Sequence, residues 1–332
     1  MSFFNKIIKS NSCYLILEAG INHNGNINSA IKLVNHAKKT KANAIKFQYF
    51  DPRDLYLEKS KNIKVLEKYY LSKENIIKIK NYCNKKKIDF LCTAYSKKSF
   101  SFLDSIGLKA HKIASMDNNN LDLIKFVANF KKTLLISTGM LEKDKLIDIV
   151  ENIKNINNKL ILLHCISNYP TIESEINLST IFYIKKLFPK FPVGFSDHSL
   201  GNDVMKLSLF YNVKVIEKHF TFDKKLNGAD HKMSINYEDV NNFLLFEKLF
   251  KESYGKNILS KKFLRPDIKN VAMFRKGLYY SKNLNKNEFL SDNIIEARPQ
   301  YNLSVENRSY FLNKQLSKNV KKLNPIKVTD FK

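Results

Sequence analysis

Eight short apolar runs alternate with longer segments of helical periodicity between residues 14 and 250, and this alternation limits the possible folds most. Each run is almost continuously apolar, as is typical of parallel strands that helices cover on both faces. We therefore predict an α/β fold in which eight strand–helix units close into a (β/α)8 (TIM) barrel. The predicted strands are Tyr14–Glu18, Ala44–Gln48, Asp89–Cys92, Ala110–Ile113, Thr133–Ser137, Leu160–Cys165, Val193–Ser196 and Val215–His219.

The segments between the runs carry apolar residues at three- and four-residue spacing, which indicates helices. A first helix is indicated around residues 27–37. The later ones are expected at Glu74–Lys86, Ser96–Ile106, Leu121–Phe130, Lys143–Ile153, Ser174–Leu187, Asn202–Tyr211 and Tyr237–Phe250. A doubly wound open sheet is the alternative architecture. That fold would need a glycine-rich phosphate turn after an early strand, and the sequence contains no GxGxxG.

The alternation of strand-like and helix-like segments ends after Tyr254. Residues 255–270 are polar and irregular, and residues 271–332 contain short strand-like pieces separated by turns, among them FRKGLYYSKNL and NPIKVTDF. We predict a barrel domain at 1–254, a linker at 255–270 and a small β-rich domain at 271–332. A length of 332 residues suits this division, since a barrel takes roughly 250 residues.

The formal net charge of +26 raises the possibility of nucleic-acid binding. The lysines are spread evenly and do not cluster, so we favour a compositional origin and expect no nucleic-acid partner. The four cysteines form no CxxC pair, which suggests buried thiols in a reducing compartment. The chain shows neither a signal-peptide pattern nor an apolar run of about 18 residues, so we expect a cytoplasmic protein without a membrane span.

Polar residues gather at the carboxyl ends of the predicted strands, where barrels of this kind carry their active sites. Lysines inside apolar strands are costly unless they are paired or solvated, so Lys46 and Lys112 point to a binding site. The candidate residues in the barrel are Glu18, Lys46, Gln48, Thr93, Lys112, Ser115, Ser137, Tyr169, Ser196, His198, His219 and Asp230.

These residue types suggest a division of tasks. The two lysines and the hydroxyls of Thr93, Ser115, Ser137 and Ser196 suit a phosphate and a carboxylate. His198 and His219 end adjacent strands and could hold a metal that keeps open positions. Glu18, Gln48, Tyr169 and Asp230 suit a polyhydroxylated substrate. We infer metal-assisted chemistry between a phosphorylated acid and a sugar-like molecule.

Ordered motifs along almost the whole chain resemble those of the sialic acid synthases, the N-acetylneuraminate and legionaminate synthase group. They are EAGINHNGN, AIKFQ, KIAS, STGM, LLHC with NYP, GFSDHSLG, and EKHFTFD with GADHKMS. The C-terminal segment is similar to that family's antifreeze-like (SAF) domain.

The resemblance implies a transferase that forms a carbon–carbon bond between phosphoenolpyruvate (PEP) and an N-acyl hexosamine. The sugar would be N-acetylmannosamine or a 2,4-diacetamido sugar, and the products a nine-carbon 2-keto sugar acid and phosphate. Glu18, His198 and His219 would be catalytic, with manganese or magnesium on the two histidines. The resemblance further implies PEP contacts from Lys46, Thr93, Lys112, Ser115, Ser137 and Ser196, and sugar contacts from Glu18, Gln48, Tyr169, Asp230 and Arg298.

The family resemblance also implies a domain-swapped homodimer in which Arg298, from EARP, reaches the partner's substrate. Three segments depart from the family's pattern: CTAY at 92–95, MD at 116–117 and QYN at 300–302. A pseudaminate-type synthase or another PEP–sugar condensation is the alternative activity. A basic nucleic-acid-binding protein built on an inactive barrel is less favoured.

Overall fold

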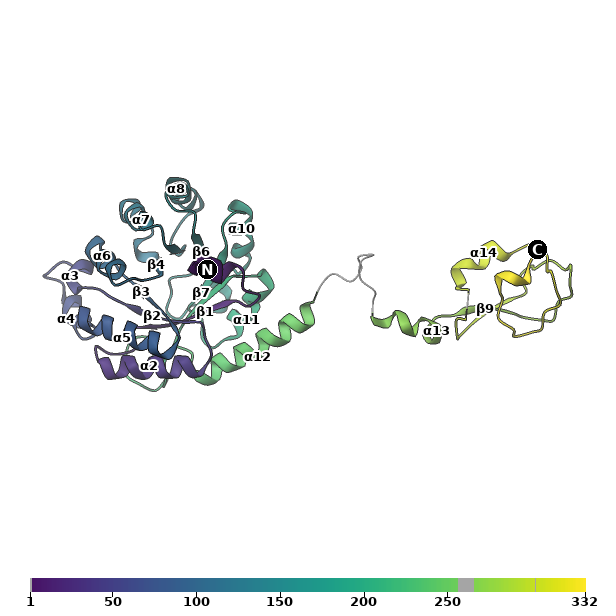
Figure 1. The fold of residues 1–332 in the computed structure, drawn as a ribbon, viewed down its shortest axis with the longest axis horizontal. Helices are drawn as coiled ribbons and strands as arrows, with labels where there is room; N and C mark the ends of the chain where they lie inside the picture. Colours follow the sequence, from purple (N-terminus) through teal and green to yellow (C-terminus); the bar gives the residue numbers. More distant parts are fainter. Residues whose placement is uncertain (1, 256–265, 302) are drawn as a thin grey trace. The chain divides into compact units, whose positions relative to one another are not determined.

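The computed structural model describes residues 2–255, 266–301 and 303–332, which divide into two compact units, Met1–Ser253 and Tyr254–Lys332. In the first unit eight parallel strands close into a barrel in chain order, with helices around the outside (Figure 1). The predicted barrel is therefore confirmed. Its strands are β1 (Tyr14–Gly20), β2 (Ala44–Gln48), β3 (Asp89–Thr93), β4 (Ala110–Ile113), β5 (Thr133–Ser137), β6 (Leu160–Cys165), β7 (Val193–Asp197) and β8 (Val215–His219).

Amphipathic helices cover the strands, and several of them begin at a polar N-cap. In α2, buried Leu33 and Val34 face the core, and the Asn26 side chain accepts hydrogen bonds from the first free backbone amides. Ser72 caps α5 in the same way. The covering helices are α2 (Ile27–Lys39), α5 (Lys73–Lys86), α6 (Lys97–Ser105), α7 (Leu121–Ala128), α8 (Lys143–Ile153), α10 (Ser179–Leu187), α11 (Asp203–Ser208) and α12 (Tyr237–Tyr254).

Several short elements differ from the sequence prediction. The single helix expected at Ser174–Leu187 is wrong: α9 (Glu173–Ile176) and α10 are separate, because Asn177 adopts a left-handed conformation with φ of 50°. The unassigned stretch between β2 and α5 contains α3 (Pro52–Leu55) and α4 (Lys61–Glu67). Single 3₁₀ turns follow β4 and α11, η1 (Ser115–Asp117) and η2 (Leu209–Tyr211).

An N-terminal helix, α1 (Phe3–Ile8), was not predicted. Its Ile7 is fully buried and belongs to the same apolar cluster as the inward-facing residues near the amino ends of the barrel strands. Phe3 meets Tyr14 edge-on, with ring centroids 5.5 Å apart. The helix therefore closes the amino end of the barrel, opposite the rim where the candidate residues were expected.

The barrel interior changes from apolar to polar along its axis. Its lower cluster comprises Ile7, Tyr14, Ile16, Ala44, Leu91, Ala110, Leu135, Ile161, Leu163 and Val215. Side chains alternate between the two faces of a strand, so the next inward positions lie two residues further on. They are occupied by Glu18, Lys46, Thr93, Lys112, Ser137, Cys165 and Glu217. An apolar floor therefore supports a polar layer at the carboxyl ends of the strands.

The second unit has its own apolar core, around Leu278, Tyr280, Leu290 and Leu316. Its strands β9 (Gly277–Tyr280) and β10 (Ile294–Ala297) pair antiparallel. The expected strand in NPIKVTDF is wrong, since this piece forms isolated bridges at Pro325 and Phe331 and the 3₁₀ turn η5 between them. The remaining elements are η3 (Pro266–Asn270), α13 (Val271–Phe274), η4 (Val305–Asn307), α14 (Arg308–Phe311) and η5 (Val328–Asp330).

Most of the predicted linker, residues 256–265, lies outside the described residues, and its described end forms η3. All four cysteines are buried free thiols, as predicted. Within the described ranges, no helix combines the length and the apolar character that crossing a membrane requires.

Candidate active site

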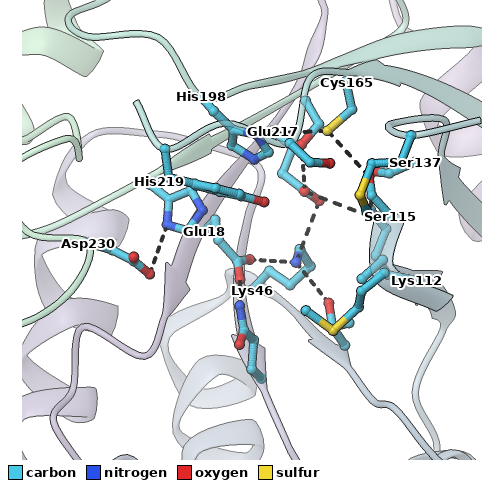
Figure 2. A pocket seen from close by; sticks show the side chains of 18 of the residues that line it. Glu18, Lys46, Lys112, Ser115, Ser137, Cys165, His198, Glu217, His219 and Asp230 are labelled. Carbon is cyan, nitrogen blue, oxygen red and sulfur yellow. Dashed lines mark hydrogen bonds and ion pairs between the residues drawn. The ribbon is translucent and has the colours of Figure 1, made fainter. Parts of the chain in front are cut away.

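A pocket of about 370 Å³ opens at the carboxyl end of the barrel. All twelve candidate residues predicted in the barrel line it, from Glu18 on β1 to Asp230 after β8. Figure 2 shows that the side chains of Lys112, Ser115 and Ser137 lie on one side and those of His198, His219 and Asp230 on the other, with Glu18, Lys46 and Glu217 between them. The remaining predicted residue, Arg298, directly follows β10 in the second unit and is exposed.

Several pocket residues were given no role by the sequence, and three of them carry polar side chains that face the predicted groups: Cys165, Ser167 and Glu217. Cys165 and Glu217 each lie two residues beyond an inward apolar position, so the alternation of the strands could have indicated them. Ser167 lies in the loop after β6, where no periodic pattern applies. Met116 and Met140 also border the pocket and are largely exposed.

Lys46 lies between two buried carboxylates. Its Nζ is 2.6 Å from Glu18 Oε2 and 3.6 Å from Glu217 Oε2, and it donates to Thr93 Oγ1 at 2.8 Å. Burial alone would lower the pKa of Lys46, but the two carboxylates outweigh it and raise the pKa. Burial raises the pKa of Glu18 despite the lowering influence of Lys46. The amide of Gln48 donates to the other oxygen of Glu18 at 3.2 Å.

Glu217 connects the two lysines of the pocket. Its Oε1 accepts a hydrogen bond from Ser196 Oγ at 3.0 Å and is 3.9 Å from Lys112 Nζ. Lys112 also donates to Ser137 Oγ at 2.7 Å. Burial opposes ionisation of Glu217, but Lys112 and Lys46 hold the pKa of this carboxyl well below its usual range. Burial lowers the pKa of Lys112, and Glu217 offsets part of that lowering.

Among these four groups, the two carboxylates offset the two ammoniums, and a third carboxyl group, Asp230, lines the pocket beside the histidines. The pocket is therefore polar without an excess of positive charge of its own.

Two serine hydroxyls lie close to the backbone of Gly139, which is in the loop after β5. A Cβ added at Gly139 would lie 2.5 Å from Ser167 Oγ and 2.6 Å from Ser115 Oγ, both closer than real contacts allow. Ser167 Oγ is buried and has no hydrogen-bond partner within the described residues, and Ser115 Oγ donates to Cys165 Sγ at 3.5 Å. Glycine at 139 therefore keeps two hydroxyls directed into the pocket.

The two histidines lie side by side, with ring centroids 5.6 Å apart. His198 Nδ1 is 2.7 Å from the carbonyl oxygen of Ile166. A carbonyl can only accept, so Nδ1 carries a proton, and Nε2 is the ring nitrogen that can bind a cation. His219 Nδ1 is buried, 3.4 Å from Asp230 Oδ2, and has no hydrogen-bond partner among the described residues. Burial lowers the pKa of His219 and favours its neutral form.

These features fit a divalent cation held by the two imidazoles. The part of the chain that the structure describes contains no group of three or more His, Cys, Asp or Glu side chains arranged for a metal ion. A cation at His198 and His219 would therefore keep several positions for water or substrate, as catalytic metal sites do. The ring of Tyr169 lies over His198, with centroids 4.2 Å apart, and borders the same space.

The chain matches a known protein family and several known proteins. The model of the NeuB family matches residues 33–258. An uncharacterised protein of Methanocaldococcus jannaschii is 35% identical over 315 residues, covering 93% of this chain and 91% of that protein. An N,N'-diacetyllegionaminic acid synthase of Campylobacter jejuni is 32% identical over 329 residues, covering 92% and 96%.

Among solved structures, an N-acetylneuraminic acid (sialic acid) synthetase of Leptospira borgpetersenii has a TM-score of 0.73 and 30% sequence identity. The match covers 78% of this chain and 89% of that chain.

Proposed function

Because this chain belongs to the NeuB family, we propose that it is a nonulosonate synthase that condenses PEP with an N-acyl hexosamine. The observation that carries the proposal is the division of the pocket, with Lys112 and hydroxyls on one side, two imidazoles on the other, and Lys46 between them. The first side suits the phosphate and carboxylate of PEP. The second suits the aldehyde and hydroxyls of an open-chain sugar.

In the proposed reaction, C3 of PEP attacks the aldehyde carbon, water adds to C2, and phosphate leaves by C–O cleavage. Lys46, Lys112 and the hydroxyls of Ser115 and Ser137 hold the anionic groups of PEP and stabilise the charge that leaves with phosphate. His198 and His219 would hold Mn²⁺ or Mg²⁺, whose Lewis acidity polarises an aldehyde oxygen. Thr93 and Ser196 complete the contacts to PEP.

The sugar side of the proposal rests on Glu18, Gln48, Tyr169 and Asp230, which border the pocket near the histidines. The raised pKa of Glu18 lets its carboxyl exchange a proton with a sugar hydroxyl or with the added water. We also propose that residues 271–332 form a SAF domain that contacts the partner in a homodimer through Arg298. Light scattering would test the dimer, and an unchanged KM for the sugar in Arg298→Ala would contradict the contact.

Phosphate release provides the direct test of the proposed activity. The purified protein should release phosphate only when PEP, an N-acyl hexosamine and a divalent cation are all present, and mass spectrometry should detect a nine-carbon acid. A panel of N-acetylmannosamine, 2,4-diacetamido sugars and their 6-phosphates distinguishes the legionaminate, neuraminate and pseudaminate types. Absence of phosphate with every sugar of the panel would rule the proposal out.

Substituting Gly139 by alanine should weaken PEP binding while the barrel stays folded. The new Cβ must displace the hydroxyls of Ser115 and Ser167, which lie 2.6 and 2.5 Å from it. Losing one or two hydrogen bonds to a charged group costs about 1.5–3 kcal/mol each, so KM for PEP should rise at least about 10-fold. Steady-state kinetics with PEP as the varied substrate measure this, and an unchanged KM would show that neither hydroxyl contacts PEP.

Replacing Glu217 by glutamine should move the alkaline limb of the pH profile to lower pH. Burial lowers the pKa of Lys112, and Glu217 is the strongest influence that raises it. Without that carboxylate the pKa of Lys112 falls further, so the lysine loses its positive charge, and its hold on phosphate, at a lower pH. The profile of kcat/KM for PEP reports the free enzyme and measures this shift. An alkaline limb that stays in place would show that Lys112 does not bind PEP as a cation.

A further inference from the structure

A buried ion pair joins the residues that precede the two histidines of the site. His198 and His219 face the pocket, whereas Asp197 and Lys218, one residue earlier in each strand, do not line it. Lys218 Nζ is 2.8 Å from Asp197 Oδ2, and the two side chains are 1% and 0% exposed. The alternation of β7 and β8 directs this pair outward, behind the histidines and beneath the helix layer.

Both members of the pair also contact Ser199, the residue that follows His198. Ser199 donates to Asp197 Oδ1 through its backbone N–H at 2.8 Å and its hydroxyl at 2.7 Å. Lys218 Nζ donates to the Ser199 carbonyl oxygen at 2.5 Å and reaches the Ser199 hydroxyl at 3.2 Å. The backbone immediately before and after His198 is thereby tied to the residue before His219.

Strand register explains why this link reaches the imidazoles. Asp197 and Lys218 are Cα partners at the last paired position of β7 and β8, and β7 ends at Asp197. His198 is one residue beyond the ladder, so the regular β7–β8 pairing does not fix it. The residue that follows each member of the pair is a histidine, and the two rings have a centroid separation of 5.6 Å.

Stability alone is a weak reason for placing such a pair here. Desolvating two charges is costly, and well-packed apolar residues of similar volume often give equal or greater stability. A fully hydrogen-bonded pair does define one geometry, because every bond of the carboxylate and ammonium restricts the backbone around them. Because the pair lies next to both histidines, the restricted backbone can also fix where the two imidazoles lie.

We propose that Asp197 and Lys218 are positioning residues that set the separation and orientation of the His198 and His219 imidazoles, and with them the affinity for a divalent cation. The inference rests on the proposed function only in taking these two histidines as the ligands of the cation. Neighbours that orient metal-binding histidines typically contribute about 10–100-fold in metal affinity.

Mn²⁺ binding, measured from the electron paramagnetic resonance signal of the free ion, tests the proposal without any turnover. The double variant Asp197→Asn/Lys218→Met removes both charges together and leaves no unpaired buried ion. We expect it to bind Mn²⁺ about 10–100-fold more weakly than the native chain, although its thermal unfolding temperature stays close to the native value. The single variant Asp197→Asn, which preserves side-chain shape but leaves the Lys218 ammonium without its carboxylate, should also bind Mn²⁺ more weakly.

Leu134→Ala is the matched control for lost stability. Leu134 is buried on β5, outside the pocket, so the variant should unfold at a lower temperature and bind Mn²⁺ normally. Native affinity in the double variant, or equal weakening in Leu134→Ala, would overturn the positioning role. If the native chain binds no Mn²⁺, or if His198→Ala binds it unchanged, the assignment of the cation to these histidines fails, and the positioning role fails with it.

Discussion

Replacing His198 by alanine should abolish cation-dependent phosphate release while the barrel remains folded. His198 presents one of the two imidazoles of the site, and its Nδ1–H is fixed by the Ile166 carbonyl, which leaves Nε2 available as a ligand. With one imidazole left, the site cannot hold a cation in place. Lewis-acid stabilisation of developing charge is worth several kcal/mol, so we expect turnover to fall about 10³-fold or more.

His111→Ala is the matched control for this substitution. His111 is a buried histidine on β4 that contacts Asp104 at 3.0 Å and lies outside the pocket. This variant should lose stability but keep the requirement for a cation and the native affinity for PEP. Circular dichroism and thermal unfolding would report the fold of both proteins. If His198→Ala kept its cation-dependent turnover, the metal assignment would be wrong.

The Lys46→Met variant should lose most of its affinity for PEP. Lys46 neutralises Glu18 at 2.6 Å and Glu217 at 3.6 Å, and all three side chains are at least nine-tenths buried. Without the ammonium, two carboxylates face an incoming anion, and a buried charge is left without its partner. Removing one member of a buried charge pair in a binding site costs about 2–5 kcal/mol of binding free energy, so kcat/KM for PEP should fall by about 30–5000-fold.

The Lys248→Met variant removes the same charge from an exposed position. The Lys248 side chain is 75% exposed on α12, so its loss should leave KM for PEP almost unchanged. Isothermal titration with PEP, together with steady-state kinetics, separates lost binding from lost chemistry. Equal effects of the two substitutions would mean that Lys46 acts only through the overall charge of the protein.

The barrel and the composition of its pocket were predictable because both follow from the period of a strand. Glu18, Lys46 and His219 each lie at a carboxyl end of an apolar run, and parallel strands bring such ends to one rim. The break between α9 and α10 was not predictable, because Asn177 interrupts an otherwise continuous helical pattern through its backbone conformation alone. The closing position of α1 depends on contacts with residues far along the chain.

The contacts that the pocket residues make with each other were less predictable than the list of residues that line the pocket. Glu217 appeared in the sequence as one charged residue beside His219, and its contacts with Lys46 and Lys112 depend on three strands meeting in space. The ion pair of Asp197 and Lys218 is likewise a product of strand register. Arg298 is located in the second unit, so its part in the reaction remains a prediction.

The charge balance inside the pocket implies that different groups control the association rate and the dissociation rate of an anion. Because the carboxyl groups of the pocket offset its two lysines, the net charge of +26 arises from the rest of the chain. Long-range attraction from that charge accelerates encounter with an anion and is screened by salt over a Debye length of about 8–10 Å. Short contacts with buried groups are screened far less. Added salt should therefore slow the association of PEP much more than it speeds its dissociation.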